Sequence, residues 1–303
     1  MRRSDCVLIR WALVGCLFGG SVTACSSGTA DQTGTTNMAT TISTGSASTM
    51  PSAQSGPQTI AYGDDPSQFG QLWLPAGTSG PIPVVVLIHG GFWRAQYPLD
   101  LMNGLARDLA HRGYAAWNLE YRRVGQLGGG YPGTLDDVAA GIDALAGFAD
   151  VDALDLGDVV LVGHSAGGHL ALWAAGRAAL PSGAPGASPI VVPRLAIGQG
   201  PVVDLVAGDR LGLGGGAVTD FIGGTAEQFP DRYAAASPST AAGVPLAVVR
   251  GTDDDIVPAP FTLPSDPSAA ARVTVVDVEG ADHFDLIDPT SSAWQAVITL
   301  LSK

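Results

Sequence analysis

One segment in the middle of the chain constrains the fold more than any other. Residues 159–162 form a short apolar run, and the sequence GHSAG follows directly at positions 163–167. The next residues, 168–173, have the alanine and leucine content of a helix. Glycines on both sides of a serine allow a sharp turn from a strand into a helix, which leaves the hydroxyl exposed at the helix N-terminus. We therefore expect Ser165 to be a nucleophile on such a turn.

The chain from residue 58 onward predicts a mostly parallel sheet with helices on both faces. Strand-like runs alternate with helical patterns, as in α/β proteins. Residues 83–88 are continuously apolar, which is typical of a strand buried on both faces. The first two runs indicate an antiparallel lead-in. The expected strands are 59–62, 69–74, 83–88, 114–121, 159–162, 194–197, 245–250 and 272–278, and the expected helices are 99–112, 134–145 (capped by Thr134 and Asp137) and 293–302.

The segment 201–239 differs from its surroundings. It is rich in glycine and shows little periodicity, and it lies between two expected strands. Long irregular insertions of this kind often cover an active site. We expect a small lid-like excursion here.

A serine nucleophile needs a base that accepts its proton, and histidine has this role in the known triads. The chain has five histidines. Four of them fit other positions, beside the serine, at a helix end or at a strand end: His164, His169, His111 and His89. His283, on a loop after the last expected strand, is the expected base.

The third group of such a site is an acid that orients the histidine. Asp253, Asp254 and Asp255 follow an expected strand and lie between Ser165 and His283 in chain order. Each of these aspartates reaches a histidine from a loop, so chemistry alone leaves the choice open. Asp204, after an earlier strand, is a more distant alternative.

A negatively charged oxygen forms when a serine attacks a carbonyl, and it needs hydrogen-bond donors. The sequence HGGFW at positions 89–93 follows the first buried strand. Its glycines let backbone N–H groups approach a substrate oxygen closely. We expect the amides of Gly91, Phe92 and Ala166 to form this oxyanion hole. Two flanking side chains receive other roles, with His89 holding the loop in place and Trp93 forming an aromatic wall of the substrate pocket.

Four motifs, at residues 89–93, 163–170, 251–258 and 280–284, resemble those of the esterase/lipase-like group of the α/β-hydrolase superfamily. The resemblance implies an α/β-hydrolase fold over one catalytic domain, residues 58–303. It also implies that Asp254 is the acid of the triad, because it matches a Gly-x-x-Asp-x-x-Val-Pro pattern. Members of the group usually have a helix after this acid. Four prolines between Asp254 and Ser268 predict that the helix is shortened or lost.

These residues predict a serine hydrolase that cleaves small carboxylic esters through an acyl-enzyme. The HGGFW sequence also resembles kynurenine formamidases, so an arylformamidase is one alternative. The layout is similar to the catalytic domains of prolyl-oligopeptidase-type peptidases, which gives a small serine peptidase as another. A surface-tethered binding module on a hydrolase scaffold is the non-enzymatic hypothesis, although binding alone gives no reason to keep the complete set of Ser, Asp and His.

The N-terminus has the layout of a secretory signal, with three arginines in residues 1–10, an apolar and glycine stretch in 11–22, and small residues after it. The sequence VTAC at positions 22–25 resembles the lipobox of bacterial lipoproteins, which implies removal of residues 1–24 and a lipid anchor on Cys25. Residues 25–57 are rich in Ser, Thr and Gly and predict a flexible tether. We therefore expect an exported, membrane-anchored lipoprotein of the cell envelope.

Charge and motif content exclude other classes. The formal net charge is −13 and the only lysine is Lys303, so no basic stripe is available to neutralise nucleic-acid phosphates. No HExxH zinc motif and no strand-linked GxGxxG occur in the sequence. We expect neither nucleic acid nor a metal or cofactor as a partner.

Overall fold

The computed structural model describes residues 56–77 and 80–302. The expected signal peptide, Cys25 and most of the expected tether lie outside these residues. Within the described part of the chain, every helix is too short or too polar to cross a membrane.

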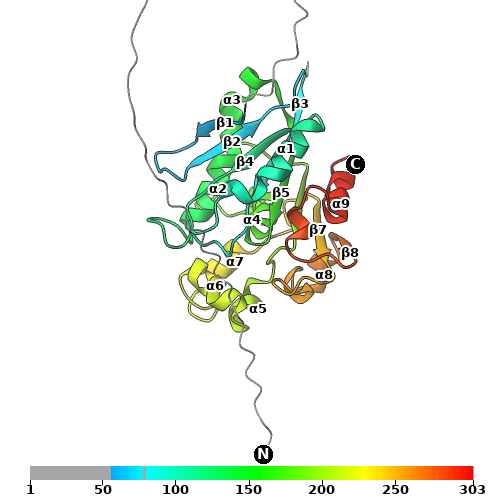
Figure 1. The fold of residues 1–303 in the computed structure, drawn as a ribbon. Helices are drawn as coiled ribbons and strands as arrows, with labels where there is room; N and C mark the ends of the chain where they lie inside the picture. Colours follow the sequence, from blue (N-terminus) through cyan, green and yellow to red (C-terminus); the bar gives the residue numbers. More distant parts are fainter. Residues whose placement is uncertain (1–55, 78–79, 303) are drawn as a thin grey trace, which may run out of the picture. The chain divides into compact units, whose positions relative to one another are not determined.

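Within the described residues, eight strands form a single sheet in the order β1-β2-β4-β3-β5-β6-β7-β8. Figure 1 shows the strands with the helices packed around them. The six strands from β4 to β8 in this order run parallel, whereas β1 pairs with β2, and β2 with β4, in antiparallel fashion. The predicted parallel sheet with its antiparallel lead-in is therefore confirmed. The strands are β1 (Gln58–Ala61), β2 (Phe69–Trp73), β3 (Ile82–Ile88), β4 (Ala115–Leu119), β5 (Leu154–His164), β6 (Leu195–Gln199), β7 (Leu246–Gly251) and β8 (Val273–Val278).

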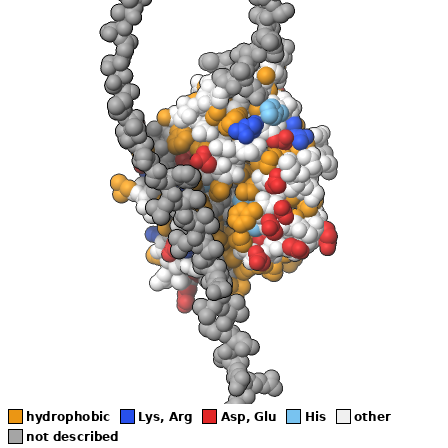
Figure 2. All heavy atoms as spheres, viewed as in Figure 1, with side chains coloured by type: hydrophobic (Ala, Val, Ile, Leu, Met, Phe, Trp, Pro, Cys, Tyr) orange, Lys and Arg blue, Asp and Glu red, His pale blue; other side chains and the backbone are white. Residues whose placement is uncertain are grey.

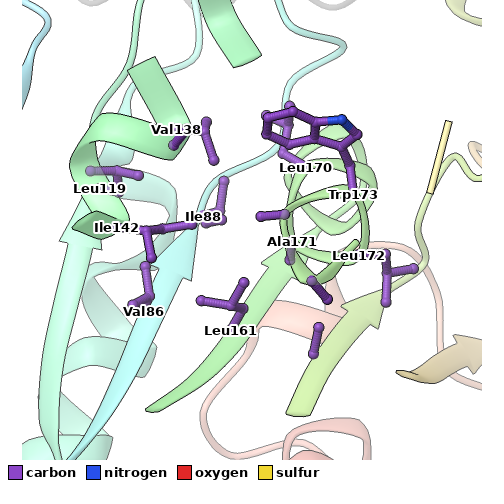
Figure 3. Close-up of a cluster of buried hydrophobic side chains, with 14 of the residues drawn as sticks. Val86, Ile88, Leu119, Val138, Ile142, Leu161, Leu170, Ala171, Leu172 and Trp173 are labelled. Carbon is purple, nitrogen blue, oxygen red and sulfur yellow. The ribbon is translucent and has the colours of Figure 1, made fainter. Parts of the chain in front are cut away.

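Helices cover both faces of the sheet, and the alternation of side chains along β3 explains why its sequence is apolar throughout. Val86 and Ile88 belong to the core cluster that contains α2 (Gly133–Asp143) and α4 (Ala166–Ala175). Figure 3 shows this cluster between the two helices and the strands. Leu87 points to the opposite face, where α1 (Asn103–His111) and α9 (Ser292–Leu301) complete the second cluster. Short additional elements are η1 (Leu99–Met102), α3 (Leu145–Asp152), η2 (Arg177–Ala179) and η4 (Asp285–Ile287).

The predicted capping box at the start of α2 is wrong. Thr134 lies inside the helix, and its hydroxyl donates to the carbonyl oxygen of Arg122. The Asp137 carboxylate accepts hydrogen bonds of 2.8 and 2.7 Å from the Arg122 guanidinium. Both side chains therefore fix the segment after β4 to the helix, a tertiary contact that the local pattern does not reveal.

The expected excursion between β6 and β7 is present, and it is helical although its sequence shows little periodicity. It contains α5 (Leu205–Arg210), α6 (Leu213–Ile222) and α7 (Pro230–Ala236). Gly214, Gly215 and Gly216 have positive φ and form a turn at the start of α6. The rest of α6 is stabilised because its apolar side chains are buried in the core. The neighbouring glycines hide the helical periodicity of these side chains in the sequence. After the three aspartates only η3 (Ala259–Phe261) and α8 (Pro267–Ala270) form, so the predicted shortening of that helix is confirmed.

Candidate active site

Ser165 stands at the turn between β5 and α4. Its backbone has φ 55° and ψ −120°, a region that non-glycine residues rarely occupy and that costs about 1–3 kcal/mol. A Cβ on Gly167 would lie 2.1 Å from the carbonyl oxygen of Ile88 and 2.3 Å from that of His89. Only glycine fits between the turn and the end of β3. The turn that carries the expected nucleophile is therefore packed closely against the end of β3 and the loop that follows it.

His283 meets Asp254 at the carboxyl ends of the strands. The Nδ1 atom of His283 lies 2.7 Å from Oδ2 of Asp254, and both side chains are nearly inaccessible. A carboxylate only accepts hydrogen bonds, so Nδ1 carries the proton in this pair. The Nε2 atom is then left to accept a proton from another group. This is the tautomer that a general base requires.

The three adjacent aspartates occupy different environments. The second carboxylate oxygen of Asp254 accepts from the amides of Ile256, at 3.0 Å, and Val257, at 2.8 Å. Asp253 and Asp255 are exposed. The more distant Asp204 caps α5. Within residues 56–77 and 80–302, no group of three or more His, Cys, Asp or Glu side chains is arranged to hold a metal ion.

The loop that carries His283 is tied to the serine turn through its backbone. The Nε2 atom of His164 lies 3.0 Å from the carbonyl oxygen of His283. The backbone oxygen of Gln199 accepts from the amide of Ser165 at 2.8 Å, and the Gln199 side chain donates to the carbonyl of Leu286. These contacts place His283 beside the turn. Among the hydrogen bonds of the described chain none joins the Ser165 hydroxyl to His283, and in unliganded enzymes this bond is often long.

His164 is a positioning residue that the sequence interpretation did not identify. Burial and the neighbouring His283 lower the pKa of His164 to about 3, so its ring is neutral near pH 7. Because the carbonyl of His283 only accepts, Nε2 of His164 carries the ring proton and donates it. The position of His164 directly before the serine is visible in the sequence. Its role is not, because its hydrogen-bond partner lies 119 residues away along the chain.

The glycine-rich loop after β3 lies against the serine. A Cβ on Gly90 would lie 2.7 Å from the carbonyl oxygen of His164 and 2.9 Å from the Cβ of Ser165. Among the described residues, no hydrogen-bond partner is found for the amides of Gly91 and Phe92. The amide of Ala166 is the first of α4, where helical N–H groups have no partner within the helix. In the part of the chain that the structure describes, none of the three expected donors is bonded to another backbone group.

A buried ionic network holds this loop from behind. His89 lies 3.2 Å from the Glu120 carboxylate and stacks on Tyr121, whose hydroxyl donates to the carbonyl of His89 at 2.7 Å. Arg123 pairs with Glu120 at 2.9 Å. Burial raises the pKa of the Glu120 carboxyl, but the interactions with His89, the Arg123 charge and the hydrogen bond from the Leu99 amide together hold it below its ordinary value. The predicted role of His89 in holding the loop agrees with these contacts, whereas Glu120 and Arg123 were missed.

The predicted role of Trp93 is wrong. Its side chain has no exposed surface. The ring stacks on Phe221 of α6 at 4.7 Å between centroids and meets His169 of α4 edge-on at 5.3 Å. Trp93 therefore joins the loop, the excursion and α4 in the core and does not line an accessible pocket. Phe92, its neighbour, is only half-buried and lies against Gly214 of the excursion.

The sheet order and the serine turn are those of the α/β-hydrolase fold. Solved structures with the same fold include a truncated carbohydrate esterase from gut microbiota, with a TM-score of 0.66, 19% identity, and coverage of 82% of this chain and 96% of the other. A thermophilic esterase from Thermogutta terrifontis superposes with a TM-score of 0.61 at 21% identity, over 82% of this chain and 92% of the other. The chain belongs to the BD-FAE family, whose model matches residues 71–262.

Curated relatives match a shorter stretch. Isoprenylcysteine alpha-carbonyl methylesterase of Arabidopsis thaliana is 32% identical over 117 residues, which make up 39% of this chain and 27% of the relative. A probable isoprenylcysteine alpha-carbonyl methylesterase of Oryza sativa subsp. japonica is 31% identical over 117 residues, 39% of this chain and 28% of the relative. The chain thus spans about a quarter of the length of these relatives.

Proposed function

We propose that this protein is a serine hydrolase that cleaves carboxylic esters of small molecules. The observation that carries the proposal is the meeting of a strained Ser165 turn with the hydrogen-bonded pair of His283 and Asp254. The loop after β3, which lies against Ser165, carries the amides of Gly91 and Phe92, and these have no partner among the described residues. A nucleophile, an oriented base and donors for an oxyanion are the parts that acyl transfer requires.

In the proposed mechanism each group has its own step. The Ser165 hydroxyl attacks the acyl carbon while Nε2 of His283 takes its proton, and Asp254 stabilises the imidazolium through Nδ1. The imidazolium then gives the proton to the departing alkoxide, which leaves as an alcohol. Water attacks the acyl-enzyme with the same histidine as base and releases the acid. In both steps the oxyanion accepts hydrogen bonds from the amides of Gly91, Phe92 and Ala166.

The comparisons support ester cleavage over the other hydrolase reactions. The curated relatives are named methylesterases, and solved structures with the same fold include a carbohydrate esterase and a thermophilic esterase. Trp93, which suggested a formamidase through the HGGFW sequence, is buried in the core and is not available to contact a substrate. An ester is therefore the substrate class that we propose.

The test uses the full chain with a fluorophosphonate probe and a panel of short-chain aryl esters, N-formylkynurenine and aminoacyl amides. We expect the probe to attach to Ser165, as located by mass spectrometry of peptides, and the esters to be cleaved fastest. Faster cleavage of N-formylkynurenine would instead favour an arylformamidase. Absence of both labelling and ester cleavage would favour a binding module.

We also propose that Cys25 anchors the protein to a membrane, on the basis of the lipobox-like VTAC sequence. In a bacterial host we expect processing before Cys25, incorporation of labelled palmitate, and partition of the protein into detergent. Cys25→Ala is expected to abolish the label, whereas Cys16→Ala, in the segment that is removed, leaves it unchanged. Retention of the label in Cys25→Ala, or a mature N-terminus elsewhere, would contradict this proposal.

A further inference from the structure

An exposed aromatic side chain stands directly beside the proposed base. Phe284 follows His283 in the chain, and 58% of its surface is accessible, although a phenyl ring on a protein surface loses the free energy gained by burial. Its ring meets the His283 ring edge-on, with 5.7 Å between centroids. Phe284 is one of five large apolar side chains that are strongly exposed in the described part of the chain, and it lies next to the proposed catalytic machinery.

The backbone that carries Phe284 is held in place despite this exposure. The Asp282 carboxylate accepts hydrogen bonds from the amides of Phe284, at 2.8 Å, and Asp285, at 2.9 Å. The carboxylate of Asp285 in turn accepts from the amide of Asp282 at 2.9 Å. The carbonyl of the intervening His283 is bonded to His164. The ring is therefore presented on a fixed turn.

The chemistry of the proposed reaction places the leaving group on this side of the site. The imidazolium of His283 must give its proton to the alkoxide oxygen, which therefore comes within about 3 Å of Nε2. In the proposed mechanism the acyl oxygen is held by the amides of Gly91, Phe92 and Ala166, which belong to the loop after β3 and the start of α4. A group attached to the alkoxide oxygen is therefore close to His283, and the His283 ring is in edge-on contact with the exposed ring of Phe284.

The charge around this surface restricts what it accepts. Asp253, Asp255 and Asp282 are exposed on the two loops that supply the acid and the base. No lysine or arginine occurs in residues 251–271 or 279–291. Figure 2 shows acidic side chains gathered over α8 and β8. Because these charges repel anions, an alcohol with a negative charge is disfavoured here.

We infer that Phe284 binds the alcohol part of the ester, and that this part is an uncharged group with a flat apolar face, such as an aryl or sugar ring. The inference rests on the proposed function, because it assigns the two sides of the ester from the role of His283. Phe284 would then determine specificity for the alcohol part, and it would contact the substrate only until the alcohol leaves. Acylation is therefore sensitive to Phe284, and hydrolysis of the acyl-enzyme is not.

Benzyl acetate and methyl acetate test this assignment, since they share the acyl group and have alcohols of similar acidity. For Phe284→Ala in the full chain, we expect kcat/KM to fall about tenfold for benzyl acetate, and to stay within about twofold of the starting protein for methyl acetate, which lacks the ring. The partition of the acetyl-enzyme between water and added hydroxylamine should not change. Ile190→Ala, which truncates another exposed apolar side chain, should leave both substrates unaffected.

A third substrate tests the charge. Acetate esters of 4-carboxybenzyl alcohol should be cleaved more slowly than benzyl acetate, and the difference should shrink at high salt, where exposed charges are screened. Equal loss of activity on the benzyl and methyl esters in Phe284→Ala, or equal cleavage of the charged and neutral esters, would overturn the inference while leaving the serine mechanism intact. If the unmodified protein cleaves no ester and Ser165 takes no probe, the proposed function fails, and this inference with it.

Discussion

Ser165→Ala is expected to reduce kcat for ester hydrolysis by about 10⁶-fold. In the proposed mechanism the Ser165 hydroxyl forms the acyl-enzyme, so alanine removes the nucleophile, and His283 and Asp254 cannot carry out acyl transfer without it. Residual cleavage should come only from substrate binding and from the oxyanion donors. Steady-state assays with a short-chain aryl ester measure the effect, and the variant should also take no fluorophosphonate.

The fold of Ser165→Ala should be unchanged, because the substitution keeps the Cβ that the turn already accommodates. Ser302→Ala, which alters an exposed serine after the last helix, is the matched control and should retain full activity. Urea denaturation checks that both variants have the midpoint of the starting protein. If Ser165→Ala keeps about 1% of the activity or more, another nucleophile must carry the reaction, because the loss would then fall far short of the expected 10⁶-fold.

The parts of the site that could be predicted from sequence are those fixed by local sterics. The turn at Ser165 is an example, because the carbonyl oxygens of Ile88 and His89 leave no space for a side chain at Gly167. The glycine at position 167 is visible in the sequence, so the sharp turn can be predicted without knowing which atoms crowd it. The parallel sheet could also be predicted, because strands and helices alternate along the chain. The hydrophobic pattern of each strand or helix depends on how that element itself is buried.

The parts that could not be predicted depend on contacts between distant segments. Trp93 follows the expected oxyanion loop in the sequence, which suggested that it lines the substrate pocket. Its burial depends on Phe221, on a helix of the excursion, against which it stacks. Glu120 is one acidic residue among many until His89 and Arg123 are seen beside it. The helices of the excursion likewise form where tertiary packing outweighs a glycine-rich local sequence.

The choice among three aspartates is the remaining prediction with a large effect. Asp254→Asn is expected to lower kcat about 10⁴-fold. The asparagine side chain fits the same space, but its amide donates where the carboxylate accepted, so it favours the wrong tautomer of His283 and does not stabilise the imidazolium. The two hydrogen bonds from the amides of Ile256 and Val257 to the other oxygen remain available. The loop should therefore keep its shape.

Asp253→Asn and Asp255→Asn are matched controls, because each removes the same charge from the same loop at an exposed position. If the role of Asp254 were only to add negative potential near His283, all three variants would lose activity to similar extents, and salt would reduce the differences. The direct bond of 2.7 Å predicts instead that the loss is confined to Asp254 and persists at high salt. A larger loss in either control than in Asp254→Asn would move the acid to that position. It would also require the loop to rearrange when substrate binds, since neither exposed carboxylate is bonded to His283 in the described structure.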